Sequence, residues 1–192
     1  MAASAAPYGA KPIGTLSASG SFTGKVQHIK IASGYDTLIS WGDFVKLVAA
    51  GTIEKDTGTT TATPVGVFMG CSYTDPTTSQ PTYAQMWTAD VAASDAMAYV
   101  LTDPNVLFQM QGDGAITQAM LGSNFAIVVT AGSTTIGRSK NAVDQSTSAT
   151  TNTLPLRIVD YVDGPDSAVG DAYTDVIMKF NVGHQYVNTT GI

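Results

Sequence analysis

The stretch GDFVKLVAAGTIEKDTGTTTATPVGVFMG, residues 42–70, decides the fold class of this chain. Over residues 43–49 the side chains alternate between two faces, with Phe44 and Val45 on opposite sides, which is the two-residue period of a β-strand. The Ala-Gly pair that follows leads into the short run TIEK, a pattern that predicts a hairpin. A further strand is expected at 64–70, where proline stands first and its missing N–H is tolerated. The stretch therefore predicts an antiparallel sheet with a Thr-rich loop.

Short apolar runs separated by turn residues recur along the rest of the chain. Regularly spaced short strands are typical of barrels and sandwiches, so we predict an all-β fold: a compact β-barrel or sandwich of short antiparallel strands with little helix. The one short helix is expected at 82–90. The polar run 132–153 is expected to be a long loop that either has a function or contacts a neighbour. Further strands are expected at residues 25–32, 96–101, 105–111, 115–118, 125–130, 156–162 and 175–182.

The N-terminal residues differ in character from the rest. Residues 1–24 show neither helical nor strand periodicity, and their Pro and Gly content predicts an extended N-terminal arm before a single β-rich domain at 25–192. Isolated apolar side chains in so polar a segment are expected to anchor the arm on a partner surface, and a frayed terminus is the alternative. The expected anchors are Tyr8, Ile13, Leu16 and Phe22.

Charge is spread unevenly along the chain. Residues 1–35 contain three lysines and no acidic residue, so they carry +3; because the whole chain carries −6, the remainder carries −9. This asymmetry predicts that the arm and the first strand dock on an acidic protein surface, and an accidental asymmetry is the alternative. Three lysines are too few to indicate nucleic-acid binding. The expected basic contact residues are Lys11, Lys25, His28 and Lys30.

Length and composition are typical of one folded domain. A chain of 192 residues, 44% of them hydrophobic, buries a sizeable core without disulfides, and Cys71 has no partner for an internal one. The first ten residues lack the basic and apolar regions of a secretory signal. The longest apolar runs are far shorter than the roughly 20 residues that span a bilayer. We therefore expect a soluble protein made in a reducing cytosol, with no membrane partner.

Residues that carry chemistry are sparse. A nucleophilic centre would need Cys71 beside His28 or His184, but Cys71 ends an expected strand with no helix start to lower its pKa. The aspartates of 160–171 lack the spacing of a calcium loop and are typical of an ordinary turn, and zinc would need more Cys and His residues. We expect no enzymatic activity, no cofactor and no metal. A carbohydrate- or host-surface-binding module is the alternative, with candidate aromatic residues Trp41, Tyr73, Tyr83 and Trp87.

Four segments resemble virion structural proteins of tailed bacteriophages, especially marine and cyanobacterial phages. They are ASGYDTLISWGDFVKLVAAGTIEK, TPVGVFMGCSYTDPTT, DPNVLFQMQGDG and LPLRIVDYVDGPDSAVGD. The 42–70 stretch is also similar to capsid decoration modules, in which short strands build a small barrel and an extended N-terminal arm joins the shell. The resemblance covers residues 25–184 and is carried by scaffold motifs.

The resemblance implies a capsid decoration (cement) protein that binds the phage major capsid protein and stabilises the shell. It implies a homodimer or homotrimer at capsid symmetry positions, on the exterior of the virion, made in the cytoplasm of the host bacterium. A major capsid protein is not expected, because the chain is short and shows no long helical pattern. Another virion component, a tail tube or minor head protein, is the alternative.

Overall fold

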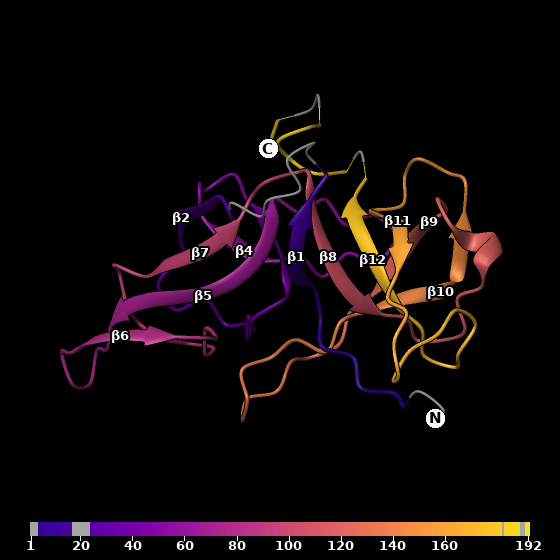
Figure 1. Cartoon of the computed structure of the whole chain (residues 1–192). Coiled ribbons are helices and arrows are strands. Elements are labelled where there is room, and N and C mark those ends of the chain that lie inside the picture. The colour runs from indigo at the N-terminus through magenta and orange to yellow at the C-terminus, as the bar shows by residue number, and fades with distance from the viewer. Residues whose placement is uncertain (1–3, 17–23, 182, 189–190) are drawn as a thin grey trace.

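The computed structural model describes residues 4–16, 24–181, 183–188 and 191–192, and it contains two antiparallel sheets packed together (Figure 1). This sandwich-like arrangement confirms the predicted all-β class. The first sheet has the order β1 (Lys11–Thr15), β8 (Val106–Gln111), β12 (Asp175–Phe180), β11 (Leu156–Tyr161), β9 (Asn124–Val128) and β10 (Ala142–Ala149). The second has the order β2 (Val26–Lys30), β7 (Met97–Leu101), β5 (Gly66–Thr74), β3 (Phe44–Leu47) and β4 (Ile53–Lys55), with β6 (Pro81–Ala84) also paired to β5. A single 3-10 turn, η1 (Gln118–Met120), is the helical part of the described residues.

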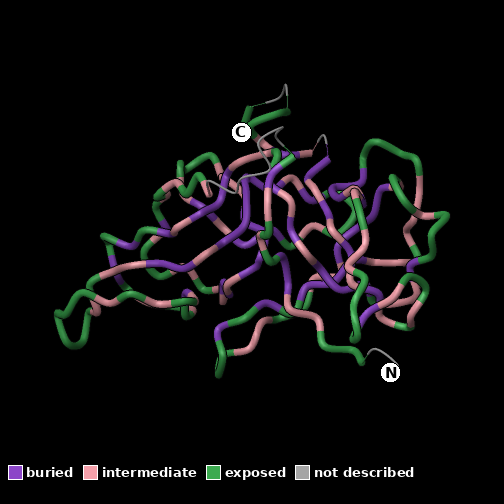
Figure 2. The backbone as a smooth tube through the Cα atoms, viewed as in Figure 1, coloured by how far each residue is buried: buried purple, intermediate pink, exposed green. Residues whose placement is uncertain are grey.

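The first hydrophobic core lies between the inner face of the first sheet and part of the second. Phe44 on β3 makes edge-to-face contacts with Phe108 and Phe180, with ring centroids 5.6 and 5.7 Å apart. Val67 on β5 and Leu101 on β7 belong to the same buried cluster. Figure 2 shows buried residues along the middle of both sheets, so the sheets are joined by a continuous apolar contact.

The other face of the second sheet packs against loops. Val45, Phe68 and Val100 belong to a second buried cluster, together with Ile39 and Trp87 from two connecting segments. Each of the three strand residues is the sequence neighbour of a residue in the first core. The predicted alternation of Phe44 and Val45 is therefore confirmed, because each points into a different core.

Part of the expected N-terminal arm is a strand of the first sheet. β1 pairs with β8, with Lys11 opposite Gln109, and the register shifts between Pro12 and Gly14. Proline is tolerated there because β1 is an edge strand. Ala10, just before the strand, is fully buried. The described part of the arm, residues 4–16, therefore belongs to the β-rich body.

Three other local expectations differ from the structure. The polar run 132–153 contains β10, which forms because β9 supplies partners for its backbone. The helix expected at 82–90 is wrong, since β6 pairs with β5 at its start and Trp87 bridges to another loop. The strand expected at 115–118 is also wrong, because the Ile116 N–H donates to the Thr174 side chain. The other expected strands are observed with ends displaced by a few residues.

Candidate functional site

Strands β1 and β2 approach the same short connection, residues 102–105, which joins β7 of the second sheet to β8 of the first. The Leu16 N–H donates to the Asn105 carbonyl oxygen at 2.9 Å. The Thr102 N–H donates to the Lys25 carbonyl oxygen at 3.3 Å. The end of β1 and the start of β2 are therefore held at the two ends of one connection, although they belong to different sheets.

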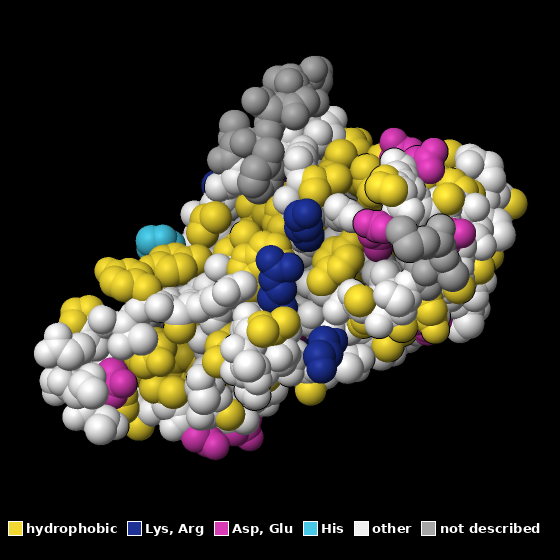
Figure 3. Space-filling view, turned by 60° about the horizontal axis from the view of Figure 1, so that its bottom comes forward, with side chains coloured by type: hydrophobic (Ala, Val, Ile, Leu, Met, Phe, Trp, Pro, Cys, Tyr) yellow, Lys and Arg dark blue, Asp and Glu magenta, His cyan; other side chains and the backbone are white. Residues whose placement is uncertain are grey.

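The exposed side chains of these two strands combine apolar and positive character. Ile13, Leu16 and Val26 are 40%, 48% and 43% exposed, and the basic residues beside them are also exposed. Figure 3 shows one face of the molecule where basic side chains lie among hydrophobic ones. We call the exposed apolar and basic side chains of β1, of β2 and of the residues that flank them the β1/β2 face. It consists of Lys11, Ile13, Leu16, Lys25, Val26, His28 and Lys30.

On β2 the exposed residues face their partners on β7. His28 lies opposite Tyr99, with ring centroids 4.7 Å apart, and Lys30 lies opposite the half-exposed Met97. These cross-strand contacts hold the basic side chains over an apolar surface. Phe22, the remaining expected anchor, lies outside the described residues.

Tyr8 has a different position from the one expected of a docking anchor. Its ring is half-buried, and burial, with the neighbouring Asp175 carboxylate, raises the pKa of the phenol. Nearby, the Gln111 side chain accepts a hydrogen bond from the Ala6 N–H at 2.7 Å and donates one to the Ser4 carbonyl at 3.2 Å. Part of the Tyr8 ring is therefore packed inside the chain, and its role as a docking anchor stays a prediction.

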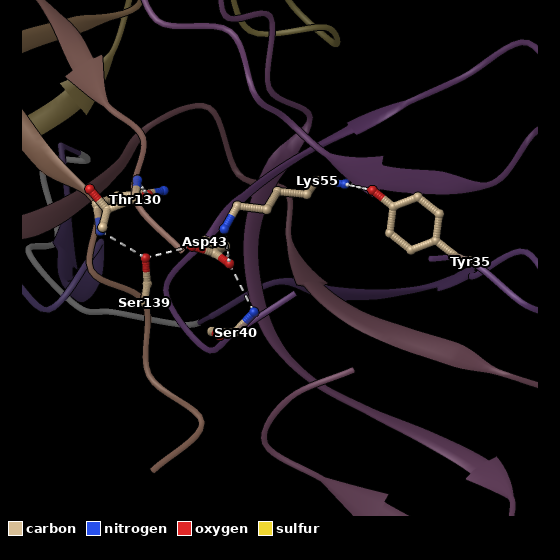
Figure 4. Close-up of polar contacts among 7 residues, drawn as sticks. Tyr35, Ser40, Asp43, Lys55, Thr130 and Ser139 are labelled. Carbon is tan, nitrogen blue, oxygen red and sulfur yellow. Dashed lines mark hydrogen bonds and ion pairs between the residues drawn. The ribbon is translucent and has the colours of Figure 1, made fainter. Parts of the chain in front are cut away.

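A buried polar centre lies between the two sheets (Figure 4). The Lys55 Nζ lies 2.9 Å from Asp43 Oδ2, and the two side chains are 5% and 0% exposed. Asp43 also accepts hydrogen bonds from the Ser40 N–H at 2.8 Å and from the Ser139 hydroxyl at 2.5 Å. The Lys55 N–H donates to the Tyr35 hydroxyl at 2.9 Å. The hydrogen bonds from Ser40 and Ser139 help to offset the cost of burying the carboxylate of this ion pair.

The same centre fixes the N-terminal segment. The Ser139 hydroxyl accepts from the Asn141 N–H, and the Asn141 side chain accepts from the Thr130 N–H at 3.0 Å. Gly9 donates its N–H to the Asn141 carbonyl at 3.2 Å and has a φ of +75°. A Cβ at Gly9 would collide with Ser139 and with the Gly42 carbonyl. Three segments distant in sequence meet here, so this centre holds the fold together and, being enclosed, offers no surface to a substrate.

The two groups that a thiol mechanism would need lie in different surroundings. Cys71 belongs to the second core, its thiol donates to the Met86 carbonyl, and burial raises its pKa to about 12. His184 packs against Phe180 of the first core at 4.9 Å, and burial lowers its pKa to about 4. At neutral pH Cys71 is a thiol and His184 is uncharged. Both are therefore structural residues of the cores.

The four aromatic candidates for carbohydrate binding differ in how far their rings are exposed to solvent. Trp87 is fully buried against Tyr73, with ring centroids 5.6 Å apart, so its assignment as a surface residue is wrong. Trp41 is half-buried beneath the Arg138 guanidinium, which lies 5.4 Å from the ring centroid. Tyr83 is 78% exposed. Of the four, Tyr83 alone presents most of its ring to solvent.

The aspartate-rich segment 160–171 begins at the end of β11 and continues into turns. Gly164 and Ser167 exchange backbone hydrogen bonds, and the Ala168 N–H donates to the Asp171 carboxylate at 3.0 Å. Within the described ranges, no group of three or more His, Cys, Asp or Glu residues is placed to hold a metal ion. Across those same ranges, no helix has the length and apolar character needed to cross a membrane.

Comparison of the chain with models of known protein families, with curated proteins and with solved structures gave no match.

Sequence reasoning missed the buried polar centre, although half of it left a signal. Lys55 follows Ile53 by two positions, so alternation places both on the same buried face, where a lysine needs a carboxylate partner. Asp43 stands directly before the first core residue of β3. No local pattern indicates Ser139, which lies 96 residues further along the chain.

Proposed function

We propose that this chain is a structural virion component, a capsid decoration (cement) protein whose β1/β2 face binds the phage major capsid shell and stabilises it. The observation that carries the proposal is the exposed combination of three lysines and three apolar side chains on β1, on β2 and on the residues that flank them, where both strands approach the 102–105 connection. Apolar side chains that folding leaves in water are available to a partner, and lysines around them favour an acidic surface. The resemblance to phage virion proteins supplies the identity of that partner.

The β1/β2 face is well suited to docking because it rests on paired strands. β1 is hydrogen-bonded to β8 and β2 to β7, so most of the contact side chains project from an ordered backbone. Binding through such a face loses less conformational entropy than binding through a free arm. The polar centre of Asp43, Lys55 and Ser139 fixes the segment that leads into β1 and so keeps the face in place.

The uneven charge distribution would orient the protein as it approaches an acidic shell. The N-terminal residues 1–35 carry +3 against −9 for the rest of the chain. An acidic shell would attract the β1/β2 face and repel the remaining surface, which orients the protein during encounter. Binding is then expected to weaken as salt increases, because exposed charges are screened. The bound form is expected to be a homodimer or homotrimer placed on capsid symmetry positions.

The test uses shells assembled from the major capsid protein encoded in the same genome. Cosedimentation is measured for the natural chain, for the double variant Lys25→Glu and Lys30→Glu, and for the control Lys140→Glu, which changes an exposed lysine that is not one of the seven residues of the face. The double variant is expected to bind about tenfold more weakly, and the control to bind like the natural chain. Equal binding by all three would overturn the proposal. Deleting residues 2–22 is a poorer test, because it removes β1 from the first sheet.

The alternative assignments, a tail tube or minor head protein, are separated by position in the particle. Cryo-electron microscopy of the virion, with the present fold fitted into density, is expected to place the chain on the outer surface of the head. Density for this fold in the tail or at the head–tail junction would refute the decoration role and support one of the alternatives.

A further inference from the structure

The free end of the second sheet carries a small surface hollow that the proposed shell binding does not use. It has a volume of about 170 Å³ and lies at the β5–β6 hairpin, where Ser72 pairs with Tyr83 and Thr74 with Pro81. Figure 1 shows this hairpin at the end of the second sheet that is furthest from the first sheet. The hollow has the size of one small polar ring rather than of a drug-sized ligand.

Tyr83 forms an aromatic wall of this hollow. At 78% exposed, it is the most exposed large hydrophobic side chain of the described residues. It lies on β6, at the edge of the sheet, and belongs to neither buried cluster. A tyrosine in this position offers a flat apolar ring with a polar end. Packing within the chain therefore gives no reason for an aromatic residue here.

A carboxylate stands at the same hollow. Asp95 accepts from the Thr74 N–H at 3.2 Å and from the Thr74 hydroxyl at 2.6 Å, and these hydrogen bonds lower its pKa. The group is therefore ionised at neutral pH and acts only as an acceptor. A carboxylate has about four acceptor positions, so room is left for donors from a ligand. The hydroxyls of Ser72 and Thr82, which also line the hollow, add donors and acceptors.

We propose that this hollow is a saccharide-binding site, at which Tyr83 stacks on the C–H face of a sugar ring while Asp95 accepts hydrogen bonds from two of its hydroxyls. A sugar ring has one apolar face and a rim of hydroxyls, and this is the complement of an exposed aromatic ring beside a carboxylate. The two side chains come from β6 and from the segment before β7, and pairing of both strands with β5 fixes their separation.

The charge of the site selects the class of saccharide. Asp95 brings a negative charge to the hollow and none of the described residues that line it is basic, so uronic or sialic acids would be repelled and neutral sugars favoured. The ligand class is a neutral oligosaccharide, such as those on bacterial cell surfaces.

The experiment is an array printed with neutral and acidic bacterial O-antigen and capsular polysaccharides, probed with the full-length chain. Binding is expected on neutral polysaccharides. Tyr83→Ala and the isosteric Asp95→Asn are each expected to reduce the signal at least tenfold. Tyr186→Ala, which removes another tyrosine that is 50% exposed, serves as the matched control and is expected to retain binding. Circular dichroism of each variant checks that the fold is kept.

Three results would overturn the saccharide site: a blank array, a preference for acidic polysaccharides, or undiminished binding by folded Tyr83→Ala. The inference does not rest on the decoration role. Shell cosedimentation of Tyr83→Ala is expected to match the natural chain, and the Lys25→Glu and Lys30→Glu variant is expected to keep its array signal. Each of the two proposals can therefore be refuted without affecting the other.

Discussion

Replacing Lys55 by methionine tests whether the buried polar centre holds the two sheets in place. Methionine keeps an apolar stem that reaches the position of the lysine ε carbon but removes the ammonium group that lies 2.9 Å from Asp43. The Asp43 carboxylate, which is 0% exposed, then loses its counter-charge and keeps the hydrogen bonds from Ser40 and Ser139. The substitution thus leaves a buried carboxylate that keeps its hydrogen bonds but has no counter-charge.

The expected loss follows from that arrangement. Breaking a buried ion pair by removing one partner costs about 3–5 kcal/mol. Because two donors to Asp43 remain, we expect Lys55→Met to lower the free energy of unfolding by about 3 kcal/mol, at the lower end of that range. For a chain of this size, each kcal/mol corresponds to roughly 2–4 °C in Tm, so the melting temperature should fall by about 6–12 °C.

Urea unfolding of a double-mutant cycle measures the effect. Asp43→Asn leaves the Lys55 ammonium buried without its counter-charge and is expected to cost about 3 kcal/mol as well. The double variant should lose at least about 2 kcal/mol less than the sum of the two single losses, because neither charge is then left alone. Lys140→Met, at an exposed lysine, is the control and should change stability by less than about 0.5 kcal/mol. Single losses below about 1 kcal/mol that simply add would refute the reasoning.

Three further results are expected. Burial lowers the pKa of His184 to about 4, against about 6.5 in the unfolded chain, so the stability that the neutral imidazole contributes is fully present above pH 6.5 and is lost as the pH falls toward 4. In urea unfolding, the loss of stability between pH 7 and pH 4.5 should therefore be about 2 kcal/mol larger for the natural chain than for His184→Phe, and equal losses would contradict the burial of a neutral His184. Cys71, buried and with its pKa raised to about 12, should react with a thiol reagent about a thousandfold more slowly in the folded chain than in urea, and fast labelling under native conditions would contradict its burial. Gly66→Ala places a Cβ against the Leu101 carbonyl and should cost more than about 2 kcal/mol in urea unfolding, whereas Gly14→Ala, where a Cβ meets open space, should be nearly neutral; equal effects would show that β5 and β7 part easily.

The alternating residues of 42–70 predicted their strands correctly because both faces of those strands are buried in apolar cores. Two neighbouring pairs show this: Phe44 and Val67 belong to the first core, and Val45 and Phe68 belong to the second. Large hydrophobic side chains therefore occupy both faces of each strand, and their alternation makes the two-residue period visible in the sequence. β10 shows the opposite case. Its sequence, AVDQSTSA, is mostly polar, and it forms a strand because β9 offers a free edge to its backbone. Such tertiary pairing leaves no local signal.

The candidate site was predictable where it depends on composition and unpredictable where it depends on distant contacts. The exposed positions of Lys11, Ile13 and Leu16 agree with isolated apolar and basic residues in a polar segment. Tyr8 looked equivalent to them in sequence, yet it is half-buried beside Asp175, more than 160 residues away. Nothing near Tyr8 in the sequence indicates that neighbour.

The pairing of β1 has a consequence for synthesis of the protein. Residues 9–15 are translated well before their partners, which are Gln109 on β8, the Asn141 carbonyl and the Ser139 side chain. The strand β1 therefore cannot be fully placed until residues up to Asn141 have been made. Non-local pairing of this kind slows folding and leaves the β8 edge open in the meantime. The lysine and proline at the start of β1 make that waiting segment a poor template for pairing between nascent chains. The strand β1 is thus made long before it can be placed, and the β1/β2 face exists only after residues up to Asn141 have been made.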